Sequence, residues 1–327
     1  MQRTGILERL ADGIVLGDGG YLLELEKRGW VRAGPFTPDV VLTRSEALRE
    51  LHAEFREAGA EVLQALTFYA SRDKLATVGL ENRLEELNRT AVRLARDEAA
   101  DRCLVAGTIS LTWMYDEGSP ASYERVRLTF DEQLRVQIEE GVDFVIAETF
   151  SWLGEARLAV ECAKRTGLPV MVTMAFENQP VTNDGYTPAD AAKALVDAGA
   201  DIVGVNCLRP PAHILPLAEA MRRAVSVPIA CQPAAYHTTA EQPDFTSHPA
   251  FPYELDRLQH SRREMAEYAL RARDIGVTFI GACCGAVASH IHAMGFAIGK
   301  VAADTPAWKR DGGRPMSACE YYGHEHV

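Results

Sequence analysis

Three cysteines stand in two short motifs that could bind a metal ion. Cys207 closes the motif GVNC, and Cys283 and Cys284 are adjacent within GACCG. Three protein ligands with one open position are typical of a catalytic zinc site, whereas structural zinc sites are closed by four. Because a thiol that binds zinc is deprotonated, a substrate thiol at the open position would be nucleophilic. The cysteines therefore favour alkyl transfer to sulfur.

Other interpretations of the cysteines stay open at this point. Cys231 falls close enough in the predicted fold to complete a closed, four-ligand zinc site. The cysteines could also be buried and unreactive, as free cysteines often are. A disulfide between the adjacent Cys283 and Cys284 would be strained. Cys103 and Cys162 are interpreted as structural because one begins a predicted strand and the other falls in a helical pattern.

The elements that must position these cysteines repeat regularly along the chain. Amphipathic stretches with helical spacing, such as 45–59 and 131–141, separate short apolar runs rich in β-branched residues. Eight strands that alternate with helices predict an α/β fold, a single (β/α)8 TIM barrel. An open doubly wound sheet is the alternative, but its G-x-G-x-x-G turn is absent after the first strand. The apolar runs cover residues 14–18, 61–68, 103–110, 143–148, 169–176, 201–207, 227–233 and 278–284.

The predicted strands end at residues that could do chemistry. Strand 1 ends at Asp18 and strand 4 at Glu148, while strands 6 and 8 end at the cysteines. In TIM barrels the active site lies at the carboxyl ends of the strands, so all of these should share one rim. We assign residues 1–303 to the barrel and 304–327 to a short polar tail.

Composition narrows the class of protein. The 327 residues carry a formal net charge of -12, which argues against a nucleic-acid partner. No apolar run is long enough to span a bilayer, so no membrane association is expected. The first residues lack the apolar core of a signal peptide, which predicts a cytoplasmic protein. In that reducing compartment clustered cysteines are more often metal ligands or catalytic groups than disulfides.

A series of motifs resembles the betaine–homocysteine S-methyltransferase family from residue 5 to about residue 300. The motifs GVNC and GACCG are shared by the wider zinc-dependent homocysteine methyltransferase superfamily. The resemblance implies zinc-dependent transfer of a methyl group from an onium donor, most simply glycine betaine, to the thiol of homocysteine, forming methionine. The motifs that carry it are, in order, GDGG, LEKRG, AGPFTP, LHAEF, LTFYASRDKL, AET, GVNC, CQPAAYHT, FPYEL and GACCG.

The resemblance assigns roles to individual residues around homocysteine. It places the Zn2+ ligands at Cys207, Cys283 and Cys284, and the carboxylates that engage the amino group of homocysteine at Asp18 and Glu148. Both carboxylates also fit the predicted rim, because a substrate ammonium needs a charged partner there. Gly19 follows Asp18 and is included among the substrate-binding residues. The alternatives are a turn residue for Asp18 and a surface carboxylate for Glu148.

The expected methyl-donor pocket departs from the family in two places. Phe68 and Tyr69 match, but the family has Trp where this chain has Phe36 and Tyr where it has Thr149. Aromatic faces hold quaternary ammonium groups, and Trp holds them best. Contacts from Trp113 or Trp152 are candidates to replace the missing rings. His237 is a candidate hydrogen-bonding residue near the donor, with a structural role as the alternative.

Several alternative functions stay open. The donor could be S-methylmethionine, S-adenosylmethionine or another betaine instead of glycine betaine. A Schiff-base aldolase would need a lysine at a strand end, and Lys74 is the nearest case. A zinc- or onium-binding protein without turnover belongs to a different class. The animal members of the family build their oligomer with a C-terminal extension where this chain has only a polar tail, so a homo-oligomer also stays open.

Overall fold

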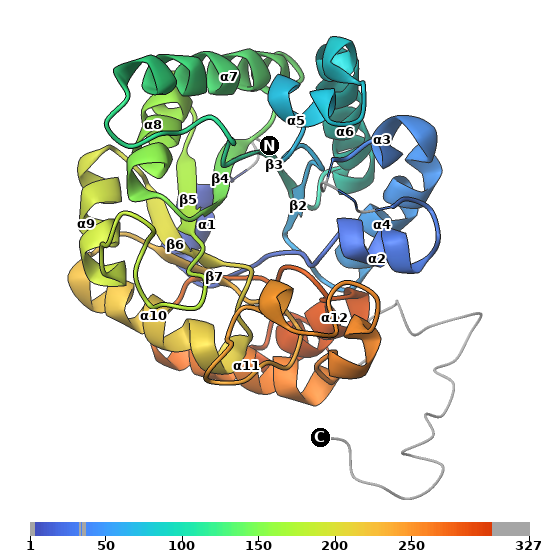
Figure 1. The fold of residues 1–327 in the computed structure, drawn as a ribbon. Helices are drawn as coiled ribbons and strands as arrows, with labels where there is room; N and C mark the ends of the chain where they lie inside the picture. Colours follow the sequence, from blue (N-terminus) through green and yellow to red (C-terminus); the bar gives the residue numbers. More distant parts are fainter. Residues whose placement is uncertain (1–3, 33, 35–36, 303–327) are drawn as a thin grey trace, which may run out of the picture.

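A computed structural model describes residues 4–32, 34 and 37–302 and shows one barrel ringed by helices (Figure 1). Eight parallel strands follow the order β1-β8-β7-β6-β5-β4-β3-β2, which confirms the predicted TIM barrel. Every apolar run that was predicted to be a strand overlaps one, and the fourth strand ends two residues beyond the predicted run 143–148. The strands are β1 (Val15–Leu16), β2 (Val62–Gln64), β3 (Leu104–Ser110), β4 (Phe144–Phe150), β5 (Val170–Met174), β6 (Ile202–Asn206), β7 (Ile229–Gln232) and β8 (Phe279–Ile280).

Helices cover the outside of the barrel: α6 to α11 each pack against at least one strand, whereas α12, after β8, packs against α11 and α4. The stretch 45–59 is helical as predicted, while the helix over 131–141 begins earlier, at Pro120, where proline suits the first helical turn. The helices are α1 (Ile6–Asp12), α2 (Leu22–Lys27), α3 (Val40–Thr43), α4 (Ser45–Glu57), α5 (Arg72–Ala76), α6 (Leu84–Ala99), α7 (Pro120–Glu139), α8 (Leu153–Lys164), α9 (Pro188–Asp197), α10 (Pro211–Ala224), α11 (Arg262–Asp274) and α12 (Ala288–Ala297). No helix among the described residues is long and apolar enough to cross a membrane.

The barrel interior changes from apolar to polar along its axis. Near the amino ends of the strands, inward side chains such as Phe144 and Ile146 of β4 form a buried core that Ile6 and Leu10 of α1 close from below. Side chains two residues apart on a strand share a face, so the next inward position after Ile146 is Glu148. On other strands, Gln64, Thr108 and Gln232 also stand two residues after an inward apolar side chain. Together with Glu148 they form a buried polar layer at the carboxyl ends of the strands.

Strands β1 and β2 close the barrel without forming a continuous ladder. One backbone bond joins them, from Glu61 N to Leu16 O at 2.8 Å. Side chains supply the rest: Glu61 Oε2 accepts from Leu16 N at 2.9 Å, and Asp18 Oδ2 accepts from Gln64 N at 2.7 Å. A carboxylate can thus replace a strand carbonyl as acceptor, which keeps the buried amide of Gln64 satisfied.

Candidate metal and substrate site

Backbone conformation turns the Cys207 side chain toward the barrel axis. Cys207 follows β6 directly, and both it and Leu208 have positive φ, at 56° and 54°. This left-handed conformation is unfavourable for residues with a Cβ, so the surrounding bonds must hold it in place. Cys207 N donates to Gln232 O at 2.8 Å, and Arg209 N donates to Cys207 O at 2.6 Å. The thiol position is therefore set by the main chain.

The loop after β8 positions the other two cysteines. Cys283 N donates to Pro233 O and Ala235 N donates to Cys284 O, each at 2.8 Å, which ties this loop to the end of β7. Gly285 has a φ of 81°, and a Cβ there would lie 2.5 Å from a ring carbon of Tyr236. Only glycine fits such a turn without displacing the neighbouring ring. The flanking glycine in GACCG thus allows two adjacent thiols to turn toward the same point.

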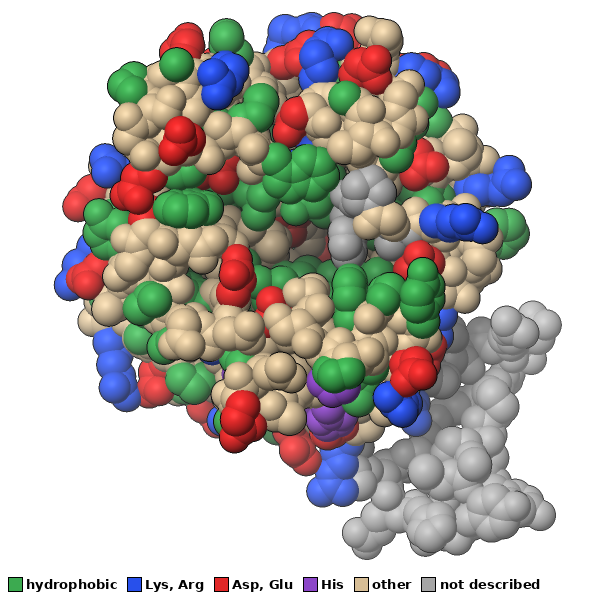
Figure 2. Space-filling view, in the orientation of Figure 1, with side chains coloured by type: hydrophobic (Ala, Val, Ile, Leu, Met, Phe, Trp, Pro, Cys, Tyr) green, Lys and Arg blue, Asp and Glu red, His purple; other side chains and the backbone are tan. Residues whose placement is uncertain are grey.

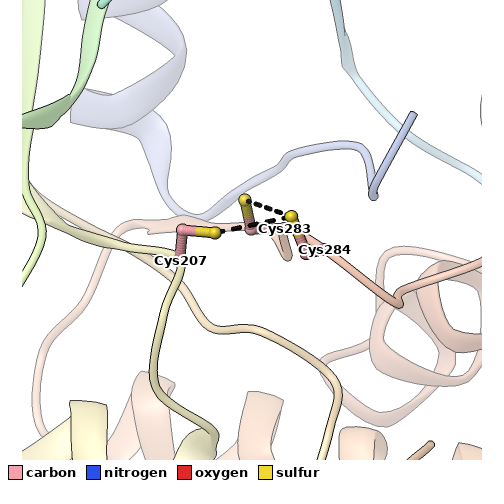
Figure 3. A group of neighbouring side chains, drawn as sticks. All are labelled: Cys207, Cys283 and Cys284. Atoms are coloured by element: carbon pink, nitrogen blue, oxygen red, sulfur yellow. Dashed lines mark hydrogen bonds between the residues drawn. The ribbon is translucent and has the colours of Figure 1, made fainter. Parts of the chain in front are cut away.

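The three sulfur atoms converge, as Figure 3 shows. Cys284 Sγ lies 3.5 Å from Cys207 Sγ and 4.0 Å from Cys283 Sγ. Sulfur ligands of a tetrahedral zinc ion, with Zn–S bonds of about 2.3 Å, stand about 3.8 Å apart. The separations therefore fit zinc. Among the described residues Cys231 does not join this group, and its thiol is buried on β7.

The three thiols differ in acidity. Hydrogen bonds from Cys283 and Cys284 lower the pKa of Cys207 well below its usual range. The same interactions with Cys207 raise the pKa of Cys283 and of Cys284 well above theirs. A bound cation would favour loss of the protons from Cys283 and Cys284. None of the six cysteines in the described part of the chain forms a disulfide bond.

Glu148 lies at the end of the inward row of β4, facing the same space as the thiols. Only 9% of the residue is exposed, and its Oε2 accepts a hydrogen bond from Asn206 Nδ2 at 3.3 Å. Burial, followed by the charges of Cys207 and Asp18, raises the pKa of Glu148 to about 8. A buried carboxyl with one weak neutral partner is suited to receive a cation.

Thr149 marks an irregularity in β4 beside Glu148. It has a φ of 65°, at a point where the register between β4 and β5 shifts. Asn206 holds this turn from both sides: its Oδ1 accepts from Thr149 N at 2.9 Å and its Nδ2 donates to Thr149 Oγ1 at 2.8 Å. The side-chain amide of Asn206 therefore orients both Glu148 and Thr149. Asn206 itself directly precedes Cys207 in the sequence.

Asp18 is completely buried and already has three hydrogen bonds. Tyr21 Oη donates to Oδ2 at 2.6 Å, and Gln64 donates from both its backbone and side-chain nitrogens. Burial raises the pKa of Asp18 to about 6, while these hydrogen bonds oppose the rise. Asp18 is adjacent to the cavity but is not one of the residues that line it.

A cavity of about 230 Å³ opens at this end of the barrel, and Figure 2 shows a hollow near the centre of that face. It brings together most of the residues predicted from sequence. His237 and Asp18 do not line it, and Phe36 lies outside the described residues. The predicted residues that do line it are Gly19, Phe68, Tyr69, Glu148, Thr149, Cys207, Cys283 and Cys284.

Sequence reasoning missed part of the cavity wall. Gln64, Thr108, Ser110 and Gln232 line it and are at least nine-tenths buried. The signal was present, because each stands two or four residues after an inward apolar residue of its strand. Phe245 also lines the cavity, but it comes from the long segment after β7, where no periodicity points to it.

An aromatic cluster lies in the loops after β2 and β3, and two of its rings, those of Phe68 and Tyr69, line the cavity. The rings of Phe68 and Tyr69 lie 4.7 Å apart, and Trp113 meets Tyr69 edge to face at 6.3 Å. Trp113 does not line the cavity, and Trp152 packs instead against Tyr115. Behind Tyr69 lies the buried Lys74 of α5, whose Nζ stands 4.2 Å from the Tyr69 ring centre and 3.3 Å from that of Trp113.

A TIM barrel with three converging cysteine thiols beside a buried carboxyl and an aromatic wall is typical of an enzyme that binds metal and small molecules. Comparison with known families identifies the class. The family model described as homocysteine S-methyltransferase matches residues 15–298, and the chain belongs to this family.

Individual relatives narrow the comparison. The chain is 42% identical over 308 residues to a betaine–homocysteine S-methyltransferase 1 of Danio rerio, covering 89% of this chain and 75% of that protein. It is 39% identical over 300 residues to an S-methylmethionine–homocysteine S-methyltransferase of Pongo abelii, covering 89% and 80%. The metallated homocysteine methyltransferase MmuM from Escherichia coli shares the fold, with a TM-score of 0.71, 20% identity and coverage of 88% and 98%.

Proposed function

We propose that this protein transfers a methyl group from an onium donor, with glycine betaine the first candidate, to the thiol of homocysteine, forming methionine. The observation that carries the proposal is the cavity itself. Its lining combines three thiols within zinc-binding distance of one another with the aromatic rings of Phe68 and Tyr69. Family membership and the betaine- and S-methylmethionine-using relatives support the same reaction.

Cys207, Cys283 and Cys284 would hold Zn2+. Their sulfur separations fit tetrahedral coordination. Thiolates bind zinc more strongly than they bind hard cations such as Mg2+ and Ca2+. When bound, zinc supplies a Lewis acid that keeps the homocysteine thiol deprotonated at neutral pH. The protein then needs no general base for the methyl transfer.

Glu148 would bind the ammonium group of homocysteine. It is buried, lines the cavity and makes only a long hydrogen bond with Asn206. Burial raises the pKa of Glu148. A bound ammonium group would lower this pKa, because it stabilises the carboxylate. Asp18 would act indirectly. Its hydrogen bonds hold Tyr21 and Gln64 in position, and both of these residues line the cavity, as does Gly19.

Phe68 and Tyr69 would hold the methyl donor. An onium group is attracted to the face of an aromatic ring, and both rings line the same cavity as the thiols. A positive donor and a negative sulfur lose their charges in the transition state, which a site with little water favours. The main catalytic contribution of these residues would be to align donor and acceptor.

The decisive experiment is methionine formation by reduced, zinc-loaded protein with homocysteine and a panel of donors. Turnover with glycine betaine supports the proposal in full. Turnover only with S-methylmethionine or S-adenosylmethionine retains the thiol acceptor and reassigns the aromatic wall to a sulfonium. Homocysteine binding without methionine from any donor would contradict catalysis and leave a binding protein.

Two further expectations belong to this proposal. Three free thiols in one site require a reducing compartment, which supports the cytoplasm as the location. The second concerns the oligomeric state: a monomer and a homo-oligomer both stay open, and sedimentation of the full chain distinguishes them.

A further inference from the structure

A second cluster of metal-ligating side chains lies outside the cavity. His237 follows β7, His260 directly precedes Ser261, the N-cap of α11, and Glu264 lies in the first turn of that helix. One ligand atom from each lies within 4.8 Å of the others, and none of the three residues lines the cavity. We propose that His237, His260 and Glu264 bind a divalent transition-metal ion at a site separate from the cysteines.

The distances within this histidine–glutamate cluster fit a metal centre. Glu264 Oε1 lies 3.2 Å from His237 Nε2 and 3.5 Å from His260 Nδ1. Nitrogen and oxygen ligands with bonds of about 2.0–2.2 Å to a tetrahedral ion stand about 3.4 Å apart. The two imidazole rings lie 3.9 Å apart between centres. One carboxylate oxygen thus faces two imidazoles from different segments.

The carboxylate of Glu264 is oriented by its other oxygen. Oε2 accepts hydrogen bonds from Ser261 N at 2.7 Å and Ser261 Oγ at 2.8 Å, which completes a capping box. Oε1 is left to the histidines. Metal-binding carboxylates are commonly fixed in this way, by a hydrogen bond to the oxygen that does not bind the ion.

His260 has a buried ring without a hydrogen bond. Its side chain is 10% exposed, and both ring nitrogens are buried and lack a hydrogen-bond partner. Burying such groups unpaired is costly, and a metal ion would supply a partner for Nδ1, the ring nitrogen that faces Glu264.

The cluster is open to solvent on one side. The side chains of His237 and Glu264 are 49% and 39% exposed, so an ion can enter and retain water at its other positions. Figure 2 shows imidazoles at the surface near α11 and α12. Two imidazoles and one carboxylate suit Zn2+, Co2+, Ni2+ or Cu2+, whereas Mg2+ and Ca2+ prefer oxygen ligands alone.

Bound metal would join the two ends of the segment between β7 and α11. His237 N donates to Leu258 O at 2.7 Å, and His260 N donates to Ala235 O at 2.8 Å. Ala235 N in turn donates to Cys284 O, so the second cluster supports the loop that carries the thiols. Metal binding here should therefore stabilise the folded protein, because it links these two segments.

The test is metal counting on full-length, reduced protein whose cysteine site is already loaded with zinc. We expect wild-type protein to bind one further equivalent of Co2+ by calorimetry, without the intense sulfur-to-cobalt absorption of a thiolate site. His260→Ala and Glu264→Gln should each weaken this binding by at least about tenfold while the first zinc is retained. Gln preserves a capping residue at position 264, so that variant separates metal binding from helix capping.

A matched control addresses the histidines of the polar tail. The double variant His324→Ala/His326→Ala should bind the second equivalent like wild type. The proposal is overturned if wild-type protein takes up no second ion. It is also overturned if His260→Ala and Glu264→Gln both retain the second ion, or if the tail variant loses it.

Discussion

Two groups of residues that line the cavity, the thiols and the aromatic rings, are positioned by different means. Main-chain hydrogen bonds and the positive φ angles of Cys207 and Gly285 set the positions of the sulfurs. The Tyr69 ring lies in the loop after β2, and its side chain contacts Trp113 of the loop after β3. Backbone geometry resists substitution of neighbouring side chains, whereas contacts between loop side chains change with each of them.

Under the proposed function, the two groups of residues would have different roles. The thiols would hold the metal and, through it, the sulfur of homocysteine, whereas the aromatic rings would contact the methyl donor. Substitutions at the rings should therefore change the choice of donor more than the binding of homocysteine.

The largest effect is expected from Cys284→Ser, because the Cys284 sulfur contacts both other thiols. Loss of a ligand that contributes about 4 kcal/mol should reduce activity about a thousandfold. Zinc content by mass spectrometry should fall from one equivalent to none at the cysteine site. Cys162→Ala on α8 is the matched control, and it should keep its zinc. A Cys284→Ser protein that retains zinc and turnover would remove Cys284 from the ligand set.

Glu148→Gln should be next in size. The neutral isostere keeps the contact with Asn206 but cannot pair with an ammonium, and losing such a buried pair costs about 2–5 kcal/mol. We expect homocysteine affinity, measured by calorimetry, to fall at least about thirtyfold, with zinc content and donor KM unchanged. Glu161→Gln, at a partly buried position on α8 that does not line the cavity, is the control. Equal homocysteine affinity in wild type and Glu148→Gln would argue against the ammonium-binding role.

Tyr69→Leu tests the aromatic rings. A cation–π contact contributes about 0.5–2 kcal/mol, so donor KM should rise about 2- to 30-fold. Homocysteine affinity should stay within about twofold, because the proposed homocysteine contacts are the metal at the thiols and Glu148. Steady-state kinetics with each substrate varied in turn measures both. An equal loss for both substrates would show that the two groups of residues are not independent.

Lys74→Met should give the smallest effect of the four variants, and the effect should be on thermal stability. Burial lowers the pKa of Lys74 to about 7, although its contacts with two rings favour the ammonium form. The folded pKa is below the unfolded one, so the cost of burying the charge is full below pH 7 and disappears as pH rises toward 10.5. Lys74→Met should therefore raise the melting temperature by about 2 °C at pH 6.5 and less at pH 9.5.

The control for this prediction is Lys193→Met, whose lysine is 57% exposed on α9. Scanning fluorimetry at both pH values compares the two variants with wild type. If Lys74→Met raises the melting temperature equally at pH 6.5 and pH 9.5, the ammonium form of Lys74 is not destabilising.

Sequence alone determined the barrel and the convergence of the thiols. Eight apolar runs separated by helical patterns have one compact solution, and Cys207, Cys283 and Cys284 stand at the ends of its strands. The alternation of inward and outward residues is local, so a linear sequence displays it. The roles carried over to Glu148 and Tyr69 came from the family motifs and remain predictions that the cavity supports.

Only the tertiary structure decided how the buried polar groups are paired. Asp18 bonds Gln64 across the closing strands, Lys74 stands between two rings, and His237 faces Glu264 instead of the cavity. Each of these partners lies tens of residues away in the chain or in a loop without periodicity. Hydrogen bonds and charge contacts act over a few ångströms in space, and the sequence does not show which distant side chains come that close.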